Sequence, residues 1–100
     1  MRADKSFDSY GHMDGLFKHV CDTITALMGG PKSVWNAHEG ATSTWYHRNL
    51  FVDVFLDRKY QMLYIHAQYP DTDRYLVCSH FHEPTQSAVD DAISRIRASL

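Results

Sequence analysis

Three side chains that can bind a metal ion recur at alternate positions near the end of the sequence, as Cys78, His80 and His82. Alternate residues of a β-strand project from one face about 7 Å apart, so these three side chains would line up. Thiolate and imidazole groups are ligands for zinc, copper and iron in proteins. His66, in the preceding predicted strand, could supply a fourth ligand if its register agrees. The pattern gives one hypothesis, a site for zinc or another transition metal.

Two simpler interpretations fit the same residues. A cysteine is often just a small buried hydrophobic residue, and histidines on an exposed sheet face need no metal. The sequence contains seven histidines in 100 residues, which would also suit a surface that responds to pH. We therefore expect no cofactor, and we keep the metal site as the alternative.

Catalytic arrangements are weaker than this metal-binding pattern. Asp53, Tyr64 and His66 can be drawn as an acid–base cluster, but chance proximity is common when histidine is abundant. The segment Gly29–Ser33 lacks the spacing of a phosphate-binding loop and follows a predicted helix rather than a strand. The sequence contains no nucleophile-elbow motif around a serine or cysteine. We expect that the protein is not an enzyme.

The elements that would position these side chains are clearest between residues 50 and 82. Three runs rich in Val, Ile, Phe and Tyr, separated by short polar segments, are typical of an antiparallel meander. A tight turn at Arg58–Lys59 would pair Val54 with Leu63. Alternation then divides the first two strands into an aliphatic face and an aromatic and polar face. The aliphatic face comprises Val52, Val54, Leu56, Leu63, Ile65 and Ala67, and the other comprises Phe51, Asp53, Phe55, Tyr60, Met62, Tyr64, His66 and Gln68.

The third run and the segment before the meander are less regular. In the third run, one face would hold Tyr75, Val77, Ser79 and Phe81, and the other would hold Leu76, Cys78, His80 and His82. Residues 34–46 resemble a hairpin closed at Gly40, which would bring Trp45 or Tyr46 near the aromatic face.

Amphipathic helices are predicted on both sides of the strands. Between residues 14 and 28 the apolar residues recur at helical spacing, Asp14 can cap the first turn, and two glycines end the helix. Between residues 86 and 99 small and aliphatic residues form a second stripe, with Ser87 and Asp90 spaced as a capping pair. The expected core is Leu16, Val20, Ile24, Leu27, Val52, Val54, Leu63, Ile65, Val89, Ile93 and Ile96.

Together these elements predict an α+β fold. We expect a two-layer sandwich in which an antiparallel sheet of roughly three to five strands carries the N-terminal and C-terminal helices on one face. Residues 1–12 are expected to form a polar tail and residues 13–100 a single domain. The order of elements is similar to that of frataxin-like iron-binding proteins, but the first predicted helix has only Asp14 and Asp22 as carboxylates and lacks their acidic ridge. We therefore assign the sequence to no family.

Composition limits the classes of partner. The net charge is −2, and basic pairs such as Arg58–Lys59 are too short to follow a phosphate backbone, so nucleic-acid binding is not expected. No apolar run reaches the ~20 residues that span a bilayer, and the polar first residues lack the apolar segment of a secretory signal. Two cysteines, Cys21 and Cys78, are weak support for a disulfide. We expect a cytoplasmic protein with free thiols and no contact with membranes.

The aromatic face of the predicted sheet gives the main functional expectation. Aromatic residues and methionine are enriched in protein interfaces, and a large apolar patch usually marks a contact surface. We expect a small soluble interaction module that acts by surface binding, as an inhibitor, immunity or regulatory protein, with a homodimer as one form. The alternative is that residues 31–49 fold over this face and bury it. The expected residues in contact with another protein or a second copy are Phe51, Phe55, Tyr60, Met62, Tyr64 and His66.

Overall fold

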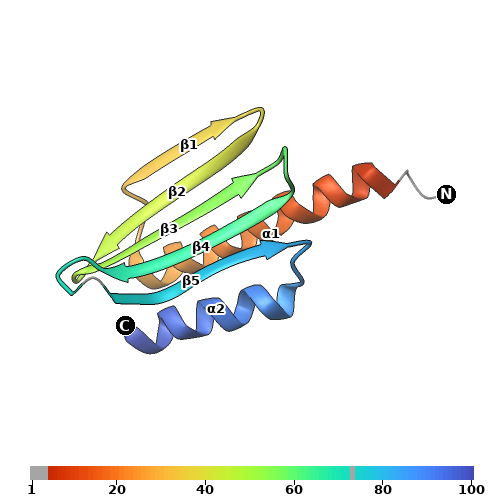
Figure 1. Ribbon diagram of the computed structural model, residues 1–100. Helices are drawn as coiled ribbons and strands as arrows, with labels where there is room; N and C mark the ends of the chain where they lie inside the picture. The colour runs from red at the N-terminus through yellow and green to blue at the C-terminus, as the bar shows by residue number, and fades with distance from the viewer. Residues whose placement is uncertain (1–4, 73) are drawn as a thin grey trace.

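Five antiparallel strands form the centre of the fold, in the same order in the sheet as in the sequence. The computed structural model describes residues 5–72 and 74–100. The elements are α1 (Lys5–Met28), β1 (Ser33–Ala37), β2 (Gly40–His47), β3 (Leu50–Asp57), β4 (Met62–Tyr69), β5 (Arg74–His82) and α2 (Gln86–Ser99) (Figure 1). Both helices lie on the same side of the sheet, where α1 contacts β2, β3 and α2, and α2 contacts β5 (Figure 1). The α+β sandwich predicted from the sequence is confirmed.

The hydrophobic core lies between the helices and the aliphatic face of the sheet. All six predicted residues of that face, Val52, Val54, Leu56, Leu63, Ile65 and Ala67, have no exposed surface. The other predicted core residues are also buried, except Leu27, which packs against the core at partial burial. The core also contains Trp45, whose indole N–H donates a hydrogen bond to Thr25 Oγ1 at 3.3 Å. This hydrogen bond pairs the indole N–H of Trp45, which is the only polar group of that buried side chain.

The sheet face that points away from the helices is partly open, and we call it the open face. Its side chains are half-buried or exposed. They include Ser33, Trp35, Thr42, Thr44, Tyr46, Phe51, Asp53, Phe55, Asp57, Met62, Tyr64, His66, Gln68, Tyr75, Cys78, His80 and His82. The segment before β3 extends the sheet as a hairpin, so the alternative in which residues 31–49 fold over this face is wrong.

The hairpin of β1 and β2 was predicted, but its turn was misplaced. The turn is His38–Glu39, and Gly40 is the first residue of β2, paired with Ala37. A Cβ atom at position 40 would lie 2.5 Å from the carbonyl oxygen of Leu56. The glycine is therefore required by the close approach of β3 rather than by the turn.

The predicted register of β3 on β4 was wrong by two residues. Val54 pairs with Ile65 instead of Leu63, because the turn contains the four residues Arg58–Gln61. Asp57 Oδ1 accepts a hydrogen bond from the backbone N–H of Tyr60 at 3.1 Å, and Gln61 has a φ of 54°. A shift of two residues keeps each side chain on its face, so the division into faces is correct for the predicted residues within β3 and β4, and only Tyr60 falls in the turn.

Strand β5 contains an irregularity that changes the predicted alternation. Ala67 pairs with Val77 and Gln68 with Tyr75, so Leu76 is an extra residue between the two pairs. As a result Tyr75 lies on the open face, with its ring 6.2 Å from that of His66, while Leu76 packs against the core. The rest of the predicted alternation holds, with Val77, Ser79 and Phe81 on the helix side.

Both helix starts differ from their predicted capping residues. Helix α1 begins at Lys5, so residues 5–12 of the predicted tail are helical, and residues 1–4 lie outside the described part of the chain. Asp14 is inside α1 and accepts a hydrogen bond from Arg58 Nε at 3.0 Å. Helix α2 has the predicted bounds, but its N-cap is Thr85, which accepts from the Ala88 N–H, and not Ser87. Among the helices within residues 5–72 and 74–100, none is long and apolar enough to cross a membrane.

Candidate functional site

The open face carries two rows of side chains that run across all five strands. One row is Trp35, Thr42, Phe55, Tyr64 and His80, and the next is Ser33, Thr44, Asp53, His66 and Cys78. The strands hold these side chains in line because residues directly opposite on antiparallel strands share a face. The rows place an aromatic strip beside a strip of polar and metal-binding groups.

Ring contacts connect the aromatic row to the histidines. Phe55 and Tyr64 are stacked, with ring centroids 5.4 Å apart and planes 30° apart. Tyr64 meets His80 edge-on at 4.6 Å. Trp35, at the end of the row on β1, is 48% exposed, so a large part of its indole is free to contact another molecule. Offset and edge-on contacts of this kind hold the rings in a fixed arrangement.

A shallow depression lies at the centre of the open face. It has a volume of about 390 Å³ and is lined by Thr42, Asp53, Phe55, Tyr64 and His66. Its floor contains aromatic rings from β3 and β4, and one carboxylate and one imidazole lie at its polar side. The depression could accept an apolar or aromatic group from a second molecule.

Five of the six residues predicted to contact a partner share the open face. Phe51, Phe55, Met62, Tyr64 and His66 lie on β3 and β4 and are half-buried. Tyr60 is instead in the turn between these strands, where it is 60% exposed and lies beside the Lys59 ammonium group, 5.3 Å from its ring centroid. The longer turn removed it from the sheet. Sequence reasoning did not identify Trp35 and Tyr75 as members of this face, because that required the pairing of β1 and the irregularity in β5.

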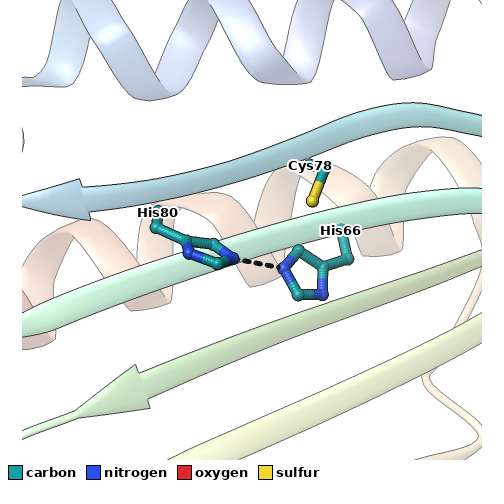
Figure 2. A group of neighbouring side chains, drawn as sticks. All are labelled: His66, Cys78 and His80. Carbon is teal, nitrogen blue, oxygen red and sulfur yellow. Dashed lines mark hydrogen bonds between the residues drawn. The ribbon is translucent and has the colours of Figure 1, made fainter.

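Three potential metal ligands come together on β4 and β5. One ligand atom from each of His66, Cys78 and His80 lies within 4.8 Å of the others (Figure 2). The Nε2 atoms of the two histidines are 3.0 Å apart, and Figure 2 shows the rings pointing at each other with the Cys78 sulfur nearby. His82, which the sequence placed in this group, is outside it and pairs with Met62 further along the strand. His66 on β4 is directly opposite Cys78 and diagonal to His80, so its imidazole can reach both. His82 is two residues further along β5 and therefore lies too far from His66.

The surroundings of His66 favour its neutral form. Burial lowers the pKa of His66 from 6.5, the nearby His80 imidazole lowers it further, and the Asp53 carboxylate partly opposes both effects. A neutral imidazole has a free lone pair, which can accept a hydrogen bond or bind a metal ion.

The two cysteines have different environments, and both are free thiols. Cys21 is half-buried, and burial raises its pKa to about 11, partly offset by a hydrogen bond with Ser43. It is therefore a packing residue that stays protonated at neutral pH. Cys78 is exposed on the open face and is the accessible thiol of the pair.

A second polar cluster lies away from the open face, at the end of the β1–β2 hairpin. Its groove, of about 700 Å³, is lined by Asp14, His38, Glu39, Arg58 and Lys59. The Arg58 guanidinium donates to Asp14 Oδ1 at 2.9–3.0 Å and to the Ala37 carbonyl oxygen at 2.6 Å. These bonds fasten the β3–β4 turn to α1 and β1, so we interpret the cluster as structural. The residues are too far apart in sequence for any spacing pattern to have predicted it.

Comparison with protein-family models, with curated proteins and with solved structures finds no match for this chain. The function must therefore be argued from the open face itself.

Proposed function

We propose that this chain is a small protein-interaction module that binds through its open face, and that the partner is a second copy of the chain. The observation that carries the proposal is the row that crosses the open face, in which the half-exposed Trp35 on β1 and the stacked rings of Phe55 and Tyr64 on β3 and β4 are aromatic. Aromatic residues and methionine are the types enriched at protein interfaces. An aromatic strip on the side of the sheet away from the helices is a surface suited to a protein contact.

The size of the open face is that of one side of a typical interface. Five strands about 4.8 Å apart and about eight residues long give a flat area of roughly 500 Å². The accessible area is larger than the flat area because side chains give the surface relief. A standard interface buries about 800 Å² of accessible surface on each partner. The flat area of the open face is therefore of the same order as one side of such an interface.

The chemistry of the open face complements itself. Asp53 on β3 and His66 on β4 are directly opposite in the same row, as are Phe55 and Tyr64 in the next row. A twofold axis parallel to the strands, between β3 and β4, would set Asp53 of one copy against His66 of the other. The same axis would set Phe55 against Tyr64 of the second copy. Pairing a carboxylate with an imidazole and a ring with a ring gives an isologous contact.

The experiment is light scattering and sedimentation equilibrium of the untagged chain over a range of concentrations, with a chelator present. We expect a reversible dimer. Phe55→Ala and Tyr64→Ala should weaken it by more than about tenfold, since aromatic residues at an interface centre often contribute about 2 kcal/mol or more. Tyr60→Ala is the matched control and should leave association unchanged, because its exposed ring is in the turn.

A chain that stays monomeric at every concentration would contradict the second copy as partner. If a different protein then bound the wild type and lost affinity on Tyr64→Ala, the face would serve an inhibitor, immunity or regulatory role. If both alanine variants instead failed to fold and the wild type never associated, the face would be an ordinary packing surface. Circular dichroism of each variant distinguishes loss of association from loss of folding.

A further inference from the structure

We propose that His66, Cys78 and His80 form a binding site for a transition-metal ion of the zinc class. All three ligands belong to one chain, so this inference does not depend on the pairing proposed above. It goes beyond that proposal because it gives the open face a second ligand.

The pairing of β4 and β5 produces the site. His66 is directly opposite Cys78, and His80 is two residues further along β5, opposite Tyr64. His66 and His80 are therefore diagonal neighbours, a distance that long side chains can bridge. The edge-on contact of Tyr64 with His80 and that of Tyr75 with His66 flank the two imidazoles. The ligands thus come from two adjacent strands of the sheet rather than from loops, and rings on both sides limit their rotation.

The distances are close to those of a coordination sphere. With Zn–N near 2.0–2.1 Å and Zn–S near 2.3 Å, the ligand atoms of a tetrahedral site are about 3.3–3.6 Å apart. The Nε2 atoms of His66 and His80 are 3.0 Å apart, and all three ligand atoms lie within 4.8 Å of one another. Small rotations of the side chains would bring them to the required separations. Without a metal, the same short distance is explained by one imidazole donating a hydrogen bond to the other.

The ligand set selects the kind of metal. Two imidazole nitrogens and one thiolate suit Zn²⁺, Co²⁺ or copper, whereas Mg²⁺ and Ca²⁺ prefer oxygen ligands. Cys78 and His80 are exposed in the single chain, so an ion can reach the site. The Asp53 carboxylate, directly opposite His66 on β3, adds a negative charge beside the site. Binding displaces the Cys78 thiol proton to the buffer, since the thiolate is the form that coordinates.

The test is a Co²⁺ titration of untagged, chelator-treated protein in a phosphine reductant, followed by displacement with Zn²⁺. We expect one ion per chain, visible bands of tetrahedral cobalt and a thiolate-to-cobalt charge-transfer band in the near ultraviolet. Cys78→Ser should abolish the charge-transfer band. His66→Gln and His80→Gln should each lower the affinity by more than about tenfold.

Two matched controls come from the same chain. His82→Gln removes an imidazole from the same strand and the same face, and Cys21→Ser removes the other thiol; neither should change the affinity or the charge-transfer band. Binding of less than about a tenth of an equivalent, or an equal loss on His82→Gln, would overturn the proposal. A charge-transfer band that survives Cys78→Ser would also overturn it. The chelator in the association experiment removes metal, so failure of the metal site leaves the test of pairing unaffected.

Discussion

Replacing Ile65 by aspartate places a carboxyl group at the centre of the core. Ile65 has no exposed surface and lies between Val54 on β3 and Ser79 on β5. Removing its buried hydrocarbon costs about 1.5–3 kcal/mol. A charged carboxylate would cost more at this depth than a protonated one, so the side chain would be neutral. Protonating an aspartate at pH 7, about three units above its ordinary pKa, costs about 4 kcal/mol. Burying the neutral acid without a partner adds about 1–3 kcal/mol.

Together these effects reach about 7–10 kcal/mol, which is comparable to the whole free energy of unfolding of a domain of this size, ~5–15 kcal/mol. We therefore expect Ile65→Asp to be largely unfolded at neutral pH, as measured by circular dichroism and urea denaturation. Gln68→Asp is the matched control, because Gln68 is on the same strand but on the open face, and it should change the stability little. A folded spectrum and an unchanged melting temperature for Ile65→Asp would refute the assignment of the two faces.

Four further predictions concern the cap of α2, the titration of His66 and the metal ligands. Thr85→Ala should lower the free energy of unfolding by about 1 kcal/mol, while Ser87→Ala changes it little, because Thr85 caps α2; the reverse order in urea denaturation would contradict the capping assignment. NMR titration in a chelator should give His66 a pKa below 6.5, and His80→Gln should raise it; a value of 6.5 or above would contradict the effect of burial. Between the lowered pKa of the folded state and 6.5, the unfolded state binds more protons at His66 than the folded state does. The contribution of His66 to the free energy of unfolding should therefore be complete above pH 6.5 and lost as the pH falls through its folded pKa. Cobalt affinity should fall in acid, since imidazole and thiol protons compete with the ion; affinity independent of pH would argue against these ligands.

The division of the sheet into two faces could be predicted because it depends only on alternation along each strand. Every second residue of β3 and β4 is aliphatic, as at Val52, Val54 and Ile65, and the apolar stripes of the helices pack against this face. The register required more than alternation. It depends on a four-residue turn held by the Asp57 side chain, with Gln61 in a conformation more common for glycine. The sequence has no glycine there to signal it.

The candidate metal site was predicted only in part for the same reason. Cys78 and His80 share a face by strand alternation, which the sequence shows directly. The approach of His66 depends on how β4 pairs with β5, and the exclusion of His82 depends on the distance along the strand. The start of α1 was missed because residues 5–12 contain only Phe7 and Tyr10 as large apolar side chains, so this part of the sequence shows no clear apolar period. Side chains that contact across strands cannot be assigned before the strands are paired.

The most direct test of the central claim, that the open face is the contact surface, is hydroxyl-radical footprinting resolved by residue with mass spectrometry. The chain is labelled in a chelator at concentrations below and above its association range. The proposal predicts that oxidation of Phe55 and Tyr64 on the open face falls as the chain is concentrated, while oxidation of Tyr60 in the turn stays constant. Oxidation of Phe55 and Tyr64 that is the same at all concentrations, or protection of Tyr60 alone, would contradict it.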